Sequence, residues 1–143
     1  MQNNEIHLAF KLISELFFNK NDKGGEPYIF HLIEVERGVR NYPCYVRTAA
    51  LLHDVIEDIH LNENDLLEYG FSFQTVNLVS ILTKKETSYD EYIKKISLNS
   101  DAIAIKLADL KHNSDITRLK GVNSKDLDRL SKYAKAYNFL KIK

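Results

Sequence analysis

The sequence is poor in the features that mark exported or membrane proteins. It has one cysteine, Cys44, so it forms no disulfide within the chain and offers no cluster of thiolates for zinc. It has no apolar run as long as a membrane span, and its N-terminus lacks the pattern of a signal peptide. We therefore expect a cytoplasmic protein with no membrane partner.

An excess of charge of one sign is also missing. Twenty Lys and Arg residues balance twenty Asp and Glu residues, and the formal net charge is zero. Proteins that bind nucleic acid or an anionic membrane through their overall field carry a net positive charge. We expect neither DNA nor RNA as a partner, whereas a local basic pocket for a phosphorylated small molecule is compatible with this balance.

Alternation of apolar and polar residues with a period of two is short everywhere, and no Asn-Gly or Asp-Gly hairpin turn occurs. Apolar residues instead recur with helical spacing, for example over 5–18 and 127–140. Helix starts are predicted at Asn62, Ser72 and Ser88. We expect an all-α fold, a single domain over 1–143 with about seven to nine helices.

The stretch 49–58 places four ionisable side chains inside an apolar run: His53, Asp54, Glu57 and Asp58. Pro43 suits the first turn of its helix, which we expect to run without interruption to about Asp58. In one helix the four side chains form two pairs, each one turn apart, beside the buried face. Partly buried carboxylates without partners cost several kcal/mol or take up protons, and a cation removes that cost. The stretch therefore predicts part of a metal site.

Two other predicted helices offer further ligands. His31 lies among apolar residues of the helix predicted over 27–38, and Asp109 ends another apolar run. With His53 and Asp54 they make a set of two imidazoles and two carboxylates. Such a set suits Mn²⁺, Fe²⁺ or Zn²⁺ and leaves room for water.

Each of these residues also has an ordinary structural interpretation. A single histidine on an apolar helix face is more often a hydrogen-bonded core residue than a ligand, and a single buried aspartate can be a cap or an ion-pair partner. Four such residues beside a second acidic pair, Glu57 and Asp58, favour the metal site. We expect His60 to be solvated, Tyr28 to serve packing, and His112 to lie outside the set.

Three motifs resemble those of a known family. His31, His53-Asp54 and Asp109 are similar to the His…His-Asp…Asp signature of HD-domain phosphohydrolases. More narrowly, 25–31 (GEPYIFH) resembles the G-x-P-Y-I-x-H stretch of RelA/SpoT-homologue alarmone hydrolases, 50–58 (ALLHDVIED) resembles their ALLHDxxED motif, and 106–113 (KLADLKHN) their KLADxxHN motif. The resemblance covers nearly the whole chain and implies a helical HD domain with the metal at its centre. Its length leads us to expect a stand-alone small alarmone hydrolase.

The resemblance implies a Mn²⁺-dependent hydrolase that removes the 3′-pyrophosphate from guanosine tetra- or pentaphosphate. By position, the metal ligands would be His31, His53, Asp54 and Asp109. Glu57 and Asp58 would be the catalytic pair, which acts on water and phosphate. The expected substrate contacts are Asn113 for the nucleotide and, for phosphate oxygens, Lys20, Lys23, Lys106 and Arg118.

The chain departs from the family pattern where substrate would bind. The basic pair before G-x-P-Y is reduced to Lys20, with Lys23 nearby, and Leu32 replaces the proline that commonly follows the first metal histidine. Asp115 stands where the family often has an arginine, and it would repel a polyphosphate if it faced the pocket. Two alternatives therefore stay open: an HD phosphohydrolase that acts on another nucleotide, and a catalytically inactive nucleotide-sensing module.

Overall fold

The computed structural model describes residues 2–143, and Met1, the first residue of the predicted domain, lies outside them. The described chain contains nine α-helices and one short 3-10 helix, with a single isolated bridge between Asn21 and Pro27 and no strand. The predicted all-α fold is confirmed. None of the helices in 2–143 is both long and apolar enough to cross a membrane.

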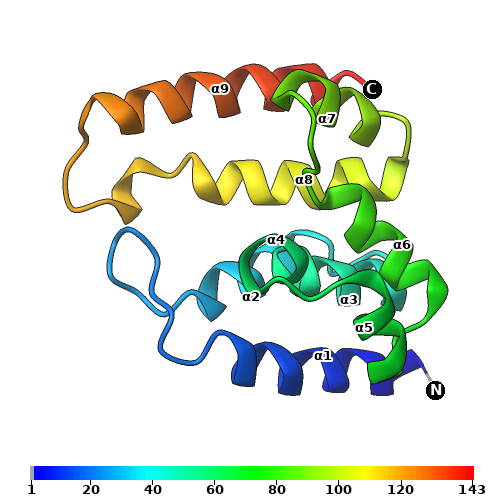
Figure 1. The fold of residues 1–143 in the computed structure, drawn as a ribbon. Coiled ribbons are helices and arrows are strands. Elements are labelled where there is room, and N and C mark those ends of the chain that lie inside the picture. Colours follow the sequence, from blue (N-terminus) through cyan, green and yellow to red (C-terminus); the bar gives the residue numbers. More distant parts are fainter. Residues whose placement is uncertain (1) are drawn as a thin grey trace.

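The helices stack in layers, as Figure 1 shows. On one side, α8 (Ser100–Asn113) packs between α9 (Ser124–Lys141) and α2 (Ile29–Gly38). On the other side, α3 (Cys44–Leu52) packs between α2 and α1 (Gln2–Leu16). The remaining elements connect or cover these layers: α4 (Val55–Ile59), α5 (Glu63–Tyr69), α6 (Phe73–Leu82), α7 (Tyr89–Ile96) and the 3-10 helix η1 (Ile116–Arg118).

Side-chain caps begin the helices where the sequence predicts them. Asn62 accepts a hydrogen bond from the backbone N–H of Asp65 in a capping box that starts α5. The side chains of Ser72 and Ser88 accept from the backbone N–H groups of Thr75 and Glu91 and so cap α6 and α7. Each cap satisfies a backbone donor that the first turn of a helix leaves without a partner.

The prediction of one uninterrupted helix to Asp58 is wrong, because the helix breaks at His53 and Asp54. α3 ends at Leu52, and α4 begins only at Val55. The ring nitrogen Nδ1 of His53 donates to the carbonyl oxygen of Ala50 at 2.7 Å. This bond takes a carbonyl that the next helical turn would otherwise use. The break turns both side chains toward α2 and α8.

The helix α8, which carries Asp109, ends at Asn113. Asp115 accepts hydrogen bonds from the backbone N–H and the hydroxyl of Thr117, at 3.0 and 2.5 Å. A side chain that bonds to the backbone two residues ahead favours a turn over a continued helix. The chain therefore leaves α8 through the short helix η1.

The core centres on α3, and α2 and α8 pack especially close together. Leu51 and Leu52 are completely buried, as are the two alanines before them. Where α2 crosses α8, Gly38 faces Ala108, and a Cβ added at Gly38 would lie 2.7 Å from the Cβ of Ala108. Gly38 therefore permits the close approach of the two helices that carry His31 and Asp109.

This close approach predicts the effect of Gly38→Ala. Alanine favours a helix over glycine by up to about 1 kcal/mol. Forcing the extra methyl against Ala108 costs about 1–3 kcal/mol, so we expect a net loss of unfolding free energy in urea unfolding. A variant as stable as the original chain would show that the helices do not pack this closely.

Gly121→Ala is the matched control. A Cβ added at Gly121 has no heavy atom within 4 Å in the described chain. We expect its unfolding free energy to stay within about 0.5 kcal/mol of the original value.

Candidate metal and catalytic site

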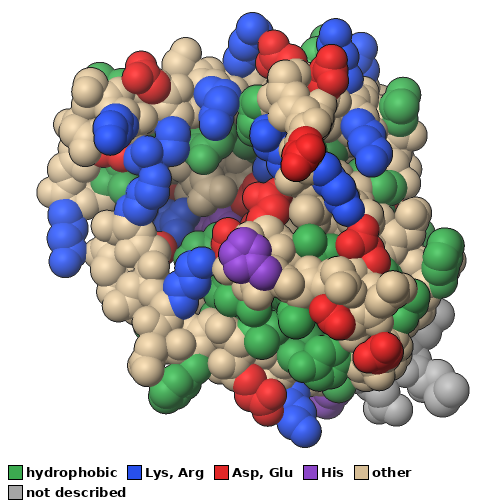
Figure 2. Space-filling view, viewed as in Figure 1, with side chains coloured by type: hydrophobic (Ala, Val, Ile, Leu, Met, Phe, Trp, Pro, Cys, Tyr) green, Lys and Arg blue, Asp and Glu red, His purple; other side chains and the backbone are tan. Residues whose placement is uncertain are grey.

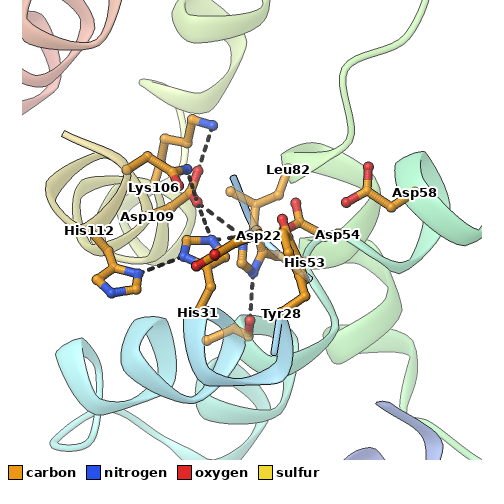
Figure 3. Close-up of polar contacts among 12 residues, drawn as sticks. Asp22, Tyr28, His31, His53, Asp54, Asp58, Leu82, Lys106, Asp109 and His112 are labelled. Atoms are coloured by element: carbon orange, nitrogen blue, oxygen red, sulfur yellow. Dashed lines mark hydrogen bonds and ion pairs between the residues drawn. The ribbon is translucent and has the colours of Figure 1, made fainter. Parts of the chain in front are cut away.

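The structure brings the four predicted ligands together from three segments. His31 lies in the first turn of α2, His53 and Asp54 lie at the break between α3 and α4, and Asp109 lies on α8. Nε2 of His31 and Nε2 of His53 are 3.0 and 3.2 Å from Oδ1 of Asp109. They are 3.9 and 3.2 Å from Oδ2 of Asp54. Ligand atoms of His31, His53 and Asp54 all lie within 4.8 Å of one another, and Asp109 contacts both histidines from the side of α8, as Figure 3 shows.

The hydrogen bonds of His53 indicate that this point requires positive charge. Its Nδ1 donates to the carbonyl of Ala50, so in the neutral imidazole Nε2 carries no proton and is an acceptor. That acceptor faces two carboxylate oxygens, an arrangement that only a proton or a cation can stabilise. Burial alone would lower the pKa of His53, but the charges of Asp54 and Asp109 raise it to about 9.

Asp109 is almost completely buried and has a full set of partners. Lys106 donates to its Oδ2 at 2.9 Å, and the amide of Asn113 donates to its Oδ1 at 3.0 Å. Burial by itself raises the pKa of Asp109, but Lys106 and the histidines hold it well below the usual range. Two of the predicted substrate contacts, Lys106 and Asn113, therefore bond to a predicted metal ligand in this structure.

Asp54 also has a partner that the sequence did not predict. The hydroxyl of Tyr28 donates to Oδ2 of Asp54 at 2.5 Å, and the Tyr28 ring stacks on Phe17 with ring centres 5.3 Å apart. Tyr28 therefore does pack, as expected, and it also orients one of the predicted ligands.

The predicted catalytic pair lies on α4, directly after Asp54. Oε1 of Glu57 accepts from the backbone N–H of Lys84 at 2.5 Å, and Oδ2 of Asp58 lies 3.6 Å from the ammonium of Lys20. Burial and the nearby charge of Asp54 raise the pKa of both carboxyls. A raised pKa brings a carboxyl closer to the range in which it exchanges protons at neutral pH.

With His53 neutral, as a metal ligand must be, the charged groups of the site leave an excess of two negative charges. It contains four carboxylates and two ammonium groups: Asp54, Glu57, Asp58, Asp109, Lys20 and Lys106. One divalent cation would cancel this excess. The residues therefore fit a divalent metal both in donor type and in charge.

A cleft of about 340 Å³ opens beside the ligands. Figure 2 shows a hollow with acidic and histidine side chains at its floor and basic side chains around it. Four of the five predicted substrate contacts line the cleft: Lys20, Lys23, Asn113 and Arg118. Asp22, Asp115 and Asp126 line it as well.

The cations of the cleft are partly neutralised by protein carboxylates. Nη2 of Arg118 bonds to Asp22 at 3.0 Å, and its Nη1 bonds to the carbonyl of His112 at 2.8 Å. Arg129 likewise pairs with Asp126. Lys23 has no ion-pair partner in the described part of the chain. Through its bonds to Asp22 and to the carbonyl of His112, Arg118 joins the loop before α2 to the end of α8.

His112, which we expect outside the ligand set, nevertheless contacts the site. Its Nδ1 lies 2.8 Å from Nδ1 of His31, and the two rings are almost parallel. Burial and the charge of Arg118 lower the pKa of His112 to about 4, so it is neutral at physiological pH. The one signal in the sequence was its place in the KLADxxHN motif, three residues after Asp109.

Comparison with curated proteins gives two distant relatives, while no family model matches the chain. The chain is 28% identical over 141 residues to a guanosine-3′,5′-bis(diphosphate) 3′-pyrophosphohydrolase of Borreliella burgdorferi, across 89% of this chain and 21% of that protein. It is 32% identical over 83 residues to a putative chloroplastic GTP diphosphokinase RSH1 of Oryza sativa subsp. japonica, across 57% of this chain and 9% of that protein. The chain thus spans only a minor part of either relative.

Among solved structures, the fold is similar to one described as a metazoan orthologue of SpoT that hydrolyses ppGpp and plays a role in starvation responses. The TM-score is 0.77 and the identity 24%, and the match covers 95% of this chain and 84% of that chain. This likeness confirms the fold that the motifs implied.

The raised pKa of His53 predicts a pH dependence for the metal-free protein. A histidine with a pKa of 6.5 when unfolded and about 9 when folded stabilises the fold fully below the lower value. This stabilisation is lost as the pH rises through the folded pKa. At 1.36 kcal/mol per pKa unit, we expect the unfolding free energy to fall by on the order of 3 kcal/mol across this window.

Urea unfolding with a chelator, at pH values below and above this window, measures the effect. The control is His53→Asn, which lacks the titrating group and should show a smaller fall. An equal fall in both proteins would contradict the assignment to His53.

Proposed function

We propose that this chain, which is related to the RelA/SpoT-type alarmone hydrolases and has their HD-domain fold, is a Mn²⁺-dependent 3′-pyrophosphohydrolase. Its substrates would be guanosine tetra- and pentaphosphate. Water attacks the phosphorus bound to the ribose 3′ oxygen, the bond between them breaks, and the products are pyrophosphate and GDP or GTP. The observation that carries the proposal is that the Nε2 atoms of His31 and His53 each lie within 3.9 Å of a carboxylate oxygen of both Asp54 and Asp109.

The residues that would hold the metal are His31, His53, Asp54 and Asp109. When bound, a divalent cation polarises a phosphoryl oxygen and lowers the pKa of a bound water. The mixed nitrogen and oxygen set suits Mn²⁺ among other transition metals, and the excess of two negative charges supports a divalent ion. Lys106 lowers the charge of the site without occupying a ligand position, since its ammonium bonds to Oδ2 of Asp109.

Glu57 and Asp58 would move the protons of the reaction. One proton must leave the attacking water, and one must reach the ribose 3′ oxygen as it departs. The two carboxyls lie on α4, directly after the ligand Asp54, and their raised pKa values favour proton exchange. The hydrogen bond from the backbone of Lys84 holds Glu57 in place.

The cleft beside the metal ligands is the proposed nucleotide site. Lys20 and Lys23 lie on one wall, and Asn113 lies on the wall formed by the end of α8. Lys20 is also placed over the rings of Phe17 and Tyr28, at 5.6 and 5.1 Å from their centres. This stacking positions its ammonium between the cleft and Asp58.

A second candidate is an HD phosphohydrolase that acts on another nucleotide. The supporting observation is the pairing of Arg118 with Asp22, together with the acidic side chain of Asp115 in the cleft. Both reduce the positive charge that a guanosine polyphosphate would meet. A catalytically inactive sensing module is less well supported, because a binding protein needs no proton-transfer pair beside its metal ligands.

Three further expectations stay predictions: a single domain over 1–143, a cytoplasmic location, and no DNA or RNA partner. The balanced charge and the single cysteine support the last two.

The substrate proposal predicts release of pyrophosphate from guanosine tetraphosphate by the purified chain with Mn²⁺, and none after chelation. The same assay on other nucleoside polyphosphates provides the comparison. Turnover of another nucleotide but not of guanosine tetraphosphate would favour the second candidate. Metal binding without turnover of any nucleotide would favour the sensing module.

The proposed role of Glu57 predicts that Glu57→Gln lowers the rate of hydrolysis by about 100-fold to 10,000-fold, because the amide cannot take up a proton. Mn²⁺ affinity should change little, since Glu57 is not one of the four ligands. Glu68→Gln, an exposed position on α5, is the control and should leave both quantities unchanged. Full activity of Glu57→Gln would exclude Glu57 from the proton transfers.

A further inference from the structure

His112 occupies a position that the proposed reaction does not use. It lies one helical turn beyond Asp109 on α8, opposite His31 on α2. Its ring and the ring of His31 are 5.1 Å apart between centres, with an angle of 10° between their planes. The Nδ1 atoms of the two rings are 2.8 Å apart, as Figure 3 shows by a dashed line. The contact joins two helices across 81 residues of sequence.

Two ring nitrogens at this distance share one hydrogen bond, so one of them carries the proton and the other accepts it. If His112 donates, the neutral ring of His31 carries its own proton on Nε2, where it can bond to Asp109. If His31 donates from Nδ1, its Nε2 is left bare. A histidine ligates a metal only through a bare nitrogen, so the second arrangement is the one compatible with the proposed metal site.

We propose that His112 is the acceptor that holds the proton of His31 on Nδ1, and thereby presents a bare Nε2 of His31 to the metal. His112 is thus a positioning residue, and the inference rests on the proposed metal site. The Nδ1 proton of the second histidine ligand is held in an equivalent way, because Nδ1 of His53 donates to the carbonyl of Ala50. A carbonyl can only accept, whereas His112 can accept or donate, so the tautomer of His31 depends on its partner.

The surroundings of His112 support this role. Arg118 donates to its backbone carbonyl at 2.8 Å and, through its other terminal nitrogen, to Asp22 at 3.0 Å. This clamp fixes the end of α8 against the loop before α2. His112 is therefore held from the backbone side while its ring meets His31.

The first test measures the affinity for Mn²⁺ by the electron paramagnetic resonance signal of the free ion. We expect His112→Phe, which keeps a flat ring but has no acceptor, to bind Mn²⁺ about 10-fold to 100-fold more weakly. His112→Asn can place its amide oxygen near the position of Nδ1, so it should recover most of this loss. His60→Asn, at an exposed position outside the cluster, should bind as the original chain does.

Two results would overturn the inference. One is unchanged affinity in His112→Phe, and the other is an equal loss in His112→Asn and His112→Phe, which would show that the ring rather than the acceptor matters. Absence of Mn²⁺ binding in the original chain would instead overturn the proposed metal site, and this inference with it.

The second test needs no variant, and it therefore stands even if His112→Phe folds poorly. Long-range proton–nitrogen NMR of the original chain, loaded with diamagnetic Zn²⁺, reports which nitrogen of each histidine carries a proton. We expect the proton of His31 on Nδ1 and a bare Nδ1 on His112. A proton on Nδ1 of His112 would contradict the proposal.

Discussion

The structure depends on one electrostatic constraint: two carboxylates and two imidazole nitrogens face one another at a buried point. Nε2 of His53, which is bare in the neutral ring, cannot approach two carboxylate oxygens to 3.2 Å inside a protein unless a proton or a cation lies between them. Protons supply that charge in the metal-free chain, as the pKa of His53 indicates. A divalent cation would supply it without protons, and the fold is arranged so that either can do so.

Several features of the fold are consequences of this constraint. The break between α3 and α4 removes helical hydrogen bonds. It directs the side chains of His53 and Asp54 toward that of His31. The contact between Gly38 and Ala108 brings α2 and α8 close enough for His31 to reach Asp109. Lys106, which is largely buried beside Asp109, partly offsets the negative charge of the site. Stability and site geometry are therefore coupled, and variants in the layer between α2 and α8 should affect both.

Much of this arrangement was readable from the sequence, because it depends on local signals. The caps at Asn62, Ser72 and Ser88 and the helical periodicity predicted the helices, and the motifs around His31, His53 and Asp109 predicted which side chains meet. The break at His53 was not readable, since a side chain that competes for a carbonyl leaves the apolar pattern unchanged. The contacts of His112 with His31 and of Arg118 with Asp22 join residues 81 and 96 positions apart. Spacing within one helix carries no information about such pairs.

We infer that His31, His53, Asp54 and Asp109 hold one metal ion between them. The most direct measurement is the anomalous X-ray diffraction of crystals grown with Mn²⁺, recorded on both sides of the manganese absorption edge. We expect one anomalous peak per chain, within bonding distance of Nε2 of His31, Nε2 of His53, Oδ2 of Asp54 and Oδ1 of Asp109. A peak held only by Glu57 and Asp58, or no peak in crystals whose four donors keep the distances given above, would contradict it.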